Sequence, residues 1–481
     1  MRELCRLDAT EQAALVRRRE VTPIELVDAA IACIEQLNPR IGAVILPAFE
    51  SARARARQMK VDNAETAPFL GVPFLMKDLG GHEAGQPFHM GMEALKRAAW
   101  REASDSYIVQ RLRAAGFVIL GRTNTPELGL LPTTEPAAYG PTRNPWKPTH
   151  SAGGSSGGAA AAVASGMVSV AHASDGGGSI RIPAAHCGLV GLKPTRGRSS
   201  FGPLAGERWA GFSCELVVSR TVRDTAALLD VIAGPAPGDP YFAARPSTPF
   251  PHAVTSRPGQ LRVGVMSTSP SPEIPVHHDC AAAVQAVAAA LAELGHAVED
   301  AHPQAYTETD RLRMYVTVVS CNVARALEVV SDKIGHTVQA DEVEPLTWAL
   351  AELGRQCSAP QYIAAIDYVH SFGRRMAAWW EQGFDLLLTP TTAAPPPLLG
   401  TLQTTPDAPL EGFIRAAPFG VFTSAFNMTG QPAISLPMHW TPDGLPVGAH
   451  LVAPYGREDL LLQVSAQLEE ARPWRDRGPP G

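Results

Sequence analysis

The chain has 481 residues, of which 45% are hydrophobic and 18% are charged, so it is neither disordered nor fibrous and can bury a large core. The formal net charge of −6 excludes an overall basic field that would attract nucleic acid or an anionic membrane. Glycine and proline, with 42 and 43 residues, indicate a globular protein rich in loops.

The seven cysteines form no CxxC pair and no His/Cys cluster at zinc spacing, so we expect reduced thiols. The segment beginning at Met1 carries charges where a signal peptide would have its apolar core, and no uncharged apolar stretch reaches the ~18 residues of a membrane span. We therefore expect a cytoplasmic protein without nucleic-acid or membrane partners, which is a monomer or a homodimer.

The first 120 residues combine helical and strand patterns. An amphipathic helix is predicted to begin at Thr22 as N-cap, with a second helix before it from Ala9 to Arg18. Residues 71–77 form a buried strand pattern that ends in a charge, Lys77. The helix predicted for Tyr107 to Ala115 and the apolar strand predicted for Phe117 to Gly121 together form a helix-to-strand unit of an α/β sheet.

The middle of the chain changes character twice. The segment from Ala159 to His172 is small and apolar enough for a closely packed buried helix, and Gly188–Leu192 is strand-like. From Gly234 to Gly259 the composition turns to proline, serine and threonine, which predicts a surface connection.

A second α/β stretch follows this connection. The predicted elements are a strand at Leu261–Met266, a helix at Cys280–Leu294, a strand from Ala297, helices between Arg311 and Trp380, short apolar runs at Phe384–Pro390 and Ala433–Pro437, and a helix at Asp459–Glu470. The alternation predicts a single α/β domain over residues 1–481. Within it we expect N-terminal helices in 1–70, a core in 71–235, a proline-rich surface connection in 236–260 and an elaborated second half in 261–481.

Two glycine-serine clusters carry the chemistry. Residues 153–158 satisfy the G-x-S-x-G pattern around Ser155, but two prolines, at 145 and 148, exclude the preceding strand that a nucleophile elbow requires. No G-K-[ST] tripeptide supports a phosphate loop. A flexible linker is disfavoured because a densely apolar pattern follows the cluster.

The second cluster, residues 174–181, favours an anion-binding turn. Consecutive glycines allow backbone N–H groups to converge on one point, and such donors stabilise an oxyanion. Ser179 directly follows these glycines and is therefore the best candidate nucleophile.

A serine nucleophile needs a base. Three histidines lie near in sequence, His150, His172 and His186, but each fits a structural role better. Lys77 is the sharper candidate, because burial at a strand end would lower its pKa toward a neutral amine. The alternative, a strand-end lysine that reaches solvent, remains open from the residues alone.

Four segments together resemble the amidase signature family: 71–78, 153–158, 175–184 and 191–197. They have the order and spacing of that family, and the resemblance continues to residues 427–437, so it covers nearly the whole chain. The resemblance implies an α/β fold with a central mixed, twisted β-sheet covered by α-helices on both faces.

The resemblance also implies a catalytic triad. Ser179 matches the nucleophile, Ser155 the serine that follows a cis peptide bond, and Lys77 the base that acts through Ser155. The oxyanion hole would be the N–H groups of Gly176, Gly177, Gly178 and Ser179, while Asp175 and Arg181 would orient the loop. No metal or organic cofactor is implied.

The implied activity is hydrolysis of amide C–N bonds through a covalent acyl-enzyme. Residues 133–136, 139–146 and 455–462 look most like the branch that acts on cyclic aminohexanoate dimers (nylon oligomers), which points to a small or oligomeric, partly apolar amide. Candidates for an acyl pocket, each of which fits core packing better, are Trp209, Phe212, Tyr315 and Cys321.

Three alternatives remain. The same machinery would cleave carbamates, as in a urethane hydrolase, and esters, because each presents a carbonyl that passes through a tetrahedral oxyanion. A glutaminase subunit of a tRNA-dependent amidotransferase would work inside a multi-subunit complex. A non-catalytic binding protein would not react with a serine-directed sulfonyl fluoride.

Overall fold

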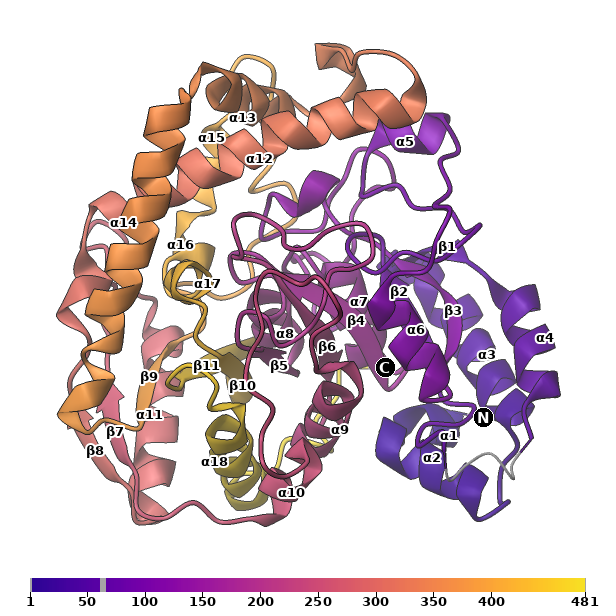
Figure 1. Ribbon diagram of the computed structural model, residues 1–481. Coiled ribbons are helices and arrows are strands. Elements are labelled where there is room, and N and C mark those ends of the chain that lie inside the picture. Colours follow the sequence, from indigo (N-terminus) through magenta and orange to yellow (C-terminus); the bar gives the residue numbers. More distant parts are fainter. Residues whose placement is uncertain (1, 61–65, 481) are drawn as a thin grey trace.

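An 11-stranded sheet runs through the computed structural model, which describes residues 2–60 and 66–480 (Figure 1). The strands lie in the order β1-β3-β2-β4-β6-β5-β10-β11-β9-β7-β8. Their bounds are β1 Val44–Pro47, β2 Pro73–Lys77, β3 Val118–Thr123, β4 Val170–Asp175, β5 Val190–Lys193, β6 Cys214–Ser219, β7 Arg262–Val265, β8 Ala297–Asp300, β9 Leu386–Pro390, β10 Ala433–Trp440 and β11 Pro446–Val452. Because β2 pairs with β4 in parallel and β4 with β6 in antiparallel, the prediction of a mixed sheet is confirmed.

Helices lie on both sides of this sheet (Figure 1). Their bounds are α1 Arg2–Arg6, α2 Ala9–Arg17, α3 Pro23–Ile41, α4 Phe49–Gln58, α5 Glu93–Arg97, α6 Tyr107–Ala114, α7 Gly157–Ala164, α8 Arg181–Cys187, α9 Val222–Ile232, α10 Phe250–Thr255, α11 His278–Glu293, α12 Asp310–Ile334, α13 Pro345–Gln356, α14 Ala359–Ala377, α15 Glu411–Arg415, α16 Ala417–Gly420, α17 Ser424–Thr429 and α18 Glu458–Ala471. The central strands β2, β4, β5, β6 and β9 are almost fully buried. Burial on both faces explains why β2, β5 and β9 are mostly apolar rather than alternating in sequence.

Several predicted elements are confirmed. The helix α3 begins after Thr22, whose side chain accepts a hydrogen bond from the N–H of Glu25 while the Glu25 carboxylate bonds back to Thr22. The helix-to-strand unit appears as α6 followed by β3, with Gly116 at φ 97° between them. In the second half, β7, α11, β8, β9, β10 and α18 overlap the predicted segments.

Two predictions about the middle of the chain are wrong. The helix expected from Ala159 to His172 ends at Ala164, because Gly166 adopts a left-handed φ of 80° and residues from Val170 onward pair with β6. The connection predicted for residues 234–259 also contains a helix, α10, which packs on α9 and α18 through the buried side chain of Phe250.

Four strands were not predicted, β1, β4, β6 and β11. The most important is β6, which lies antiparallel between β4 and β5 and places Glu215 directly opposite Ser174. The two halves of the chain meet in the same sheet where β5 pairs with β10. The boundaries of the regions within the chain stay predictions.

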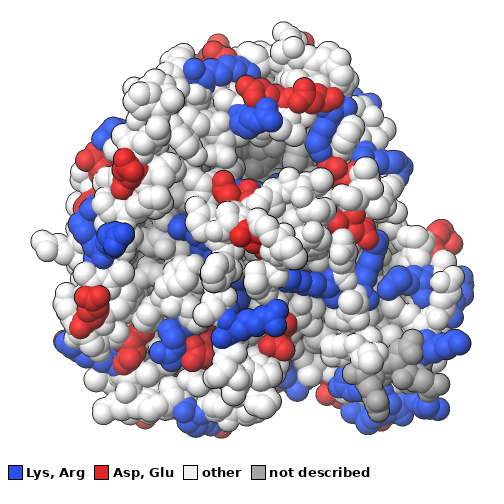
Figure 2. Space-filling model, in the orientation of Figure 1, with Lys and Arg blue, Asp and Glu red and all other residues white. Residues whose placement is uncertain are grey.

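The long helix α12 packs against α13 and α14 around the rim of the molecule (Figure 1). In the described part of the chain, it is the one helix whose length and composition would suit a membrane span, and 39% of its apolar window is buried. In the view of Figure 2, basic and acidic side chains are interspersed over the surface, and the face is hollowed near its top centre.

Candidate active site

Lys77 is the last residue of β2 and is fully buried, so it does not reach solvent. Its Nζ donates to Ser155 Oγ at 2.7 Å and to Ser174 Oγ at 3.0 Å. Burial lowers the pKa of Lys77 to about 7, although the negative charges of Asp175 and Glu215 act to raise it. The amine is therefore able to take up a proton near neutral pH.

Ser155 lies in the bend before α7, and the Gly154–Ser155 peptide bond is cis. A side chain at Gly154 would meet the backbone of Thr133 at 2.5 Å, so only glycine fits at this close approach. Ser155 is 2% exposed, and its segment is joined to the second glycine cluster by a hydrogen bond from Ser156 N to Ser179 O at 3.3 Å.

Ser179 lies between β4 and α8, at the end of the glycine turn. It lines both a large pocket and a small polar cavity, and Ser155 borders the small cavity as well. The structure thus brings Lys77, Ser155 and Ser179, which are separated by more than 20 residues in each case, to one place.

The glycines of the turn are enclosed by side chains. A Cβ at Gly176 would lie 3.0 Å from the Trp209 ring, and a Cβ at Gly177 would lie 2.4 Å from the Tyr315 hydroxyl. Tyr315 donates to Gly176 O at 3.1 Å, and Thr423 donates to Gly177 O at 2.6 Å. The carbonyl groups of the turn are therefore held from outside.

The Asp175–Arg181 pair fixes the turn from within. The Asp175 carboxylate accepts from the N–H groups of Gly178 at 2.7 Å and Ile180 at 3.0 Å, and from the Arg181 guanidinium at 2.9 and 3.0 Å. Burial would raise the pKa of Asp175, but the charge and hydrogen bonds of Arg181 hold that pKa well below its usual range. Both side chains are fully buried, so the pair is a rigid part of the site.

One predicted oxyanion donor needs correction. The N–H of Gly178 is directed at Asp175 Oδ1, so this amide is engaged in holding the turn and does not face a substrate. Asn427 also holds this pair and was not among the predicted site residues: its amide donates to Asp175 Oδ1 at 2.9 Å and accepts from Arg181 at 2.7 Å. Its short-range sequence carries no signal of this contact, because the partners are about 250 residues apart.

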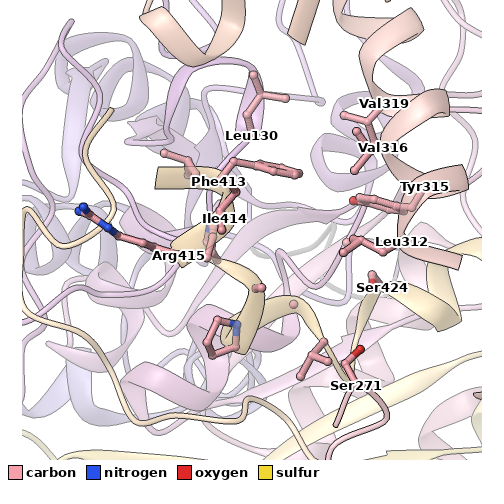
Figure 3. Close-up of a pocket in the computed structure, with 18 of the residues that line it drawn as sticks. Leu130, Ser271, Leu312, Tyr315, Val316, Val319, Phe413, Ile414, Arg415 and Ser424 are labelled. Atoms are coloured by element: carbon pink, nitrogen blue, oxygen red, sulfur yellow. The ribbon is translucent and has the colours of Figure 1, made fainter. Parts of the chain in front are cut away.

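A cavity of about 670 Å³ opens beside Ser179. One wall is the α12 face with Leu312, Tyr315, Val316 and Val319, and the facing wall includes Leu130, Phe413 and Ile414 (Figure 3). Its charged lining residues are Glu273, Arg311 and Arg415, and Arg415 points away from the cavity in Figure 3. The lining is mainly apolar, as in pockets that take uncharged organic molecules.

The predicted pocket residues divide into two pairs. Trp209 and Tyr315 line the cavity, contrary to the expectation of core packing. Phe212 is fully buried and stacks on Tyr315 at 5.7 Å, and Cys321 lies beside Gly354 O at 3.9 Å, so both pack away from the cavity. The sequence predicted helices in this region, and the apolar face of α12 fits that prediction. The same apolar pattern does not show that this face lines a cavity.

None of the three histidines is hydrogen-bonded to Ser155 or Ser179 in the described part of the chain. His172 lies in β4 and His186 in α8, both buried, and their ring nitrogens have no hydrogen-bond partner in the part of the chain that the structure describes. Burial lowers the pKa of each. His150 contacts Thr149 Oγ1 through Nδ1 at 3.0 Å.

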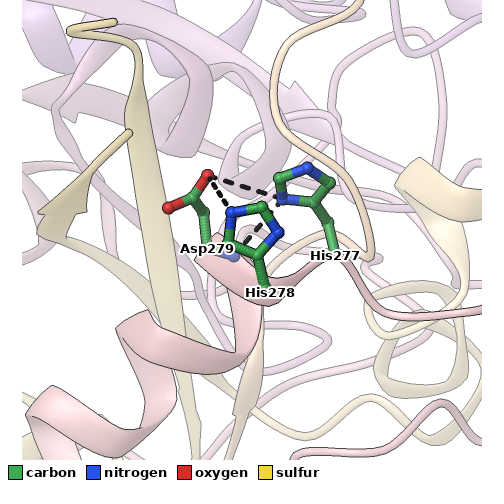
Figure 4. A group of neighbouring side chains, drawn as sticks. All are labelled: His277, His278 and Asp279. Atoms are coloured by element: carbon green, nitrogen blue, oxygen red, sulfur yellow. Dashed lines mark hydrogen bonds and ion pairs between the residues drawn. The ribbon is translucent and has the colours of Figure 1, made fainter. Parts of the chain in front are cut away.

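One cluster has the composition of a metal site. At the start of α11, the ligand atoms of His277, His278 and Asp279 lie within 4.8 Å of one another (Figure 4). Asp279 Oδ2 lies 3.5 Å from His277 and 3.4 Å from His278, and its N–H donates to His277 as a helix cap. These residues do not line the cavity beside Ser179.

Comparison with known proteins agrees with this geometry. The sequence model of the Amidase family matches residues 25–462. The chain is 45% identical to the 6-aminohexanoate-cyclic-dimer hydrolase of Pseudomonas sp. (strain NK87) over 479 residues, which cover 98% of this chain and 96% of that protein.

Solved structures give the same result. A structure of 6-aminohexanoate cyclic dimer hydrolase complexed with substrate matches with a TM-score of 0.95 and 44% identity over 99% of both chains. A bacterial aryl acylamidase of the amidase signature family matches with a TM-score of 0.87 and 28% identity, over 97% of this chain and 96% of that one.

Proposed function

Because the chain belongs to the amidase family and is an amide-hydrolysing enzyme, we propose that it cleaves C–N bonds through Ser179 as nucleophile, Ser155 as relay and Lys77 as base. The observation that carries this proposal is the hydrogen bond of 2.7 Å between the fully buried Lys77 amine and Ser155, next to the cavity that Ser179 lines. Buried amines of lowered pKa are suited to accept a proton near neutral pH.

In the first half of the reaction, Ser179 Oγ forms a bond to the carbonyl carbon of the amide. Its proton passes to Ser155 Oγ while the proton of Ser155 passes to Lys77 Nζ. The oxyanion accepts hydrogen bonds from the turn, for which the amides of Gly176, Gly177 and Ser179 are the candidates. The C–N bond then breaks, and the nitrogen leaves as an amine with the proton returned through the same relay.

In the second half, water attacks the acyl-enzyme. Its proton again reaches Lys77 through Ser155, and the C–O bond to Ser179 breaks as that oxygen regains a proton. The products are a carboxylic acid, which ionises, and the free serine. No step requires a metal or an organic cofactor.

The substrate that we propose is a small or oligomeric, partly apolar amide of the nylon-oligomer type. The apolar walls of the cavity support an alkyl or aryl substrate that is uncharged near the scissile bond, and the name of the relative with 45% identity supports aminohexanoate amides. The mainly apolar walls suit such an amide better than glutamine, whose α-amino and carboxylate groups would find charged partners only in Glu273, Arg311 and Arg415 among the lining residues.

The test is hydrolysis by the purified chain, with no partner added, of an aryl amide, the matched aryl ester, the matched carbamate and the cyclic dimer of 6-aminohexanoate. We expect turnover of amides that is lost in Ser179→Ala. A carbamate rate far above the amide rate would favour a urethane hydrolase. No turnover of any substrate, with Ser179 unlabelled by a sulfonyl fluoride, would contradict the proposal.

A further inference from the structure

The small cavity that borders Ser155 and Ser179 is polar on one side. Its volume is about 70 Å³, and its polar lining residues are Ser155, Ser174, Ser179, Arg208, Ser213 and Glu215. This volume holds several water molecules, since one water needs roughly 10–15 Å³ of such space. We call this cavity the polar chamber.

Two residues that line the chamber have a buried polar atom without a hydrogen-bond partner in the described part of the chain, Oε1 of Glu215 and Nε of Arg208. Next to Glu215, both ring nitrogens of the buried His172 also lack a hydrogen-bond partner, and its Nε2 lies 3.8 Å from Glu215 Oε1. Buried polar atoms are normally satisfied by protein groups or by ordered water. The chamber is therefore a site for bound water beside the two serines.

The pairing of strands β4 and β6 brings Glu215 close to Lys77, the proposed base. In the pairing of β4 with β6, Glu215 stands opposite Ser174, and Ser174 Oγ accepts a hydrogen bond from Lys77 at 3.0 Å. Opposite residues of an antiparallel pair have their Cβ atoms about 4.5–5.5 Å apart. Ser174 thus stands between the amine and the carboxylate, and no direct ion pair joins Lys77 to Glu215 among the described residues.

Glu215 has no bonded counter-charge among the described residues, whereas the other nearby carboxylate has one. Asp175 is compensated by the Arg181 guanidinium and by backbone N–H groups. Glu215 has no bonded cation of this kind. The positive charges of Arg208 and Lys77 act to lower its pKa, but burial outweighs them and raises that pKa to about 7. A fully buried carboxylate without a bonded cation is costly, so it calls for a function.

We propose that Glu215 is a positioning residue for Lys77, whose carboxylate compensates, through Ser174 and the water of the polar chamber, the positive charge that Lys77 gains when it takes up the serine proton. This inference rests on the proposed function. The proton moves from Ser179 through Ser155 to Lys77 and back to the leaving amine, and Glu215 keeps its own protonation state throughout. Such compensation is needed because Lys77 is fully buried, and a buried ammonium group without a counter-charge is costly.

The other titratable and charged groups around Lys77 and Glu215 are unaltered in a variant that changes Glu215 alone. They are Asp175 and His172 on β4, Arg208 before β6, and Arg122 on β3, which donates to Lys77 O. Burial holds the pKa of His172 well below its ordinary value, so that ring is uncharged. Loss of the Glu215 charge should therefore lower the pKa of Lys77, because the negative charge of Glu215 acts to raise that pKa.

The test is the pH profile of kcat/KM for Glu215→Gln on an aryl ester and an aryl amide from pH 5 to 10. We expect the acid limb to move to lower pH by about one unit and the alkaline plateau to fall about tenfold, with KM little changed. Glu215→Asp retains the charge and should restore the wild-type midpoint. If Glu215→Gln does not fold, the test uses Glu215→Met instead, which also removes the charge and keeps a side chain of similar length.

The matched control is Glu469→Gln, which removes a mostly buried carboxyl group that bonds only to the N–H of Val222 in the described structure and does not line the cavities. Its pH profile should match the wild type. An unshifted midpoint in Glu215→Gln, with or without a lower plateau, would overturn the inference and leave the proposed function intact. Residual wild-type turnover in Ser179→Ala would instead overturn the proposed function.

Discussion

Lys77 Nζ lies 2.7 Å from Ser155 Oγ, and the amine is fully buried at the end of a central strand. The two residues are 78 positions apart in the chain, and β2 and the bend before α7 bring them together. This contact joins a candidate base to a hydroxyl group beside the candidate nucleophile.

The first prediction concerns pH. Because Lys77 must be neutral to accept a proton and its pKa is about 7, kcat/KM should rise from acid to alkaline pH with a midpoint near 7. Protonation below the midpoint removes the base, so the acid side is the inactive one. A steady-state profile on an aryl amide measures this, and a flat profile from pH 5 to 9 would exclude a lysine base.

The second prediction compares substitutions in the triad. Lys77→Met keeps the length of the side chain but removes the amine, and it should lower kcat/KM by about 10²–10⁴-fold. Ser155→Ala should leave some turnover, whereas Ser179→Ala should abolish acyl-enzyme formation. The control is Lys147→Met, at a partly exposed lysine paired with Asp443, which should change activity little. Equal residual turnover in Ser155→Ala and Ser179→Ala would remove Ser179 from its role.

The third prediction tests the crowding of the turn. Gly177→Ala would place a methyl group 2.4 Å from the Tyr315 hydroxyl, so the turn must shift and kcat should fall by about 10²–10³-fold. Tyr315→Phe removes the hydroxyl group and makes room for the methyl group. The kcat of the double variant should therefore be at least tenfold higher than that of Gly177→Ala, a difference of roughly 1.4 kcal/mol. Strictly additive losses in this double-mutant cycle would show that Tyr315 does not enclose the turn.

The fourth prediction concerns the buried pair under the turn. Asp175→Asn leaves the Arg181 guanidinium without its counter-charge, so the free energy of unfolding should fall by about 3–5 kcal/mol. Chemical denaturation measures the loss, and activity should fall with it because the turn is no longer held. The comparison is Asp459→Asn in the exposed pair with Arg457, for which the loss should stay within about 1 kcal/mol.

The fifth prediction concerns the cavity wall. Val316 faces the cavity from α12, so Val316→Trp should fill part of it (Figure 3). KM for a bulky amide should rise by about tenfold or more, while inactivation by a small sulfonyl fluoride should stay near the wild-type rate. An unchanged KM would mean that the substrate binds elsewhere.

Much of the fold was predictable because local signals agreed with the final structure. The cap at Thr22 and the apolar strand before Lys77 depend on neighbouring residues, and both appear as expected. The segment after Ala164 was misassigned because the alanine-rich pattern that ends there suits a helix and the apolar residues continue beyond it, whereas pairing with β6 makes residues from Val170 onward a strand. Tertiary pairing therefore decided the structure where local propensity was ambiguous.

The candidate site was only partly predictable, for a related reason. Lys77, Ser155 and Ser179 lie in motifs that the sequence displays, but their burial and distances depend on the sheet order. Glu215 lies in no such motif, and the segment 427–437 carries no sign of the contact that Asn427 makes, because each residue meets its partners across strands or helices distant in sequence. The same holds for Gly178, whose amide faces Asp175.

In the proposed reaction, Ser179 forms a covalent acyl-enzyme during hydrolysis. The most direct test is intact-mass and peptide mass spectrometry of the protein, acid-quenched during turnover of an activated aryl ester. We expect a mass increase equal to one acyl group, located on Ser179 and missing in Ser179→Ala. Turnover with no adduct under burst conditions, or an adduct on another residue, would contradict it.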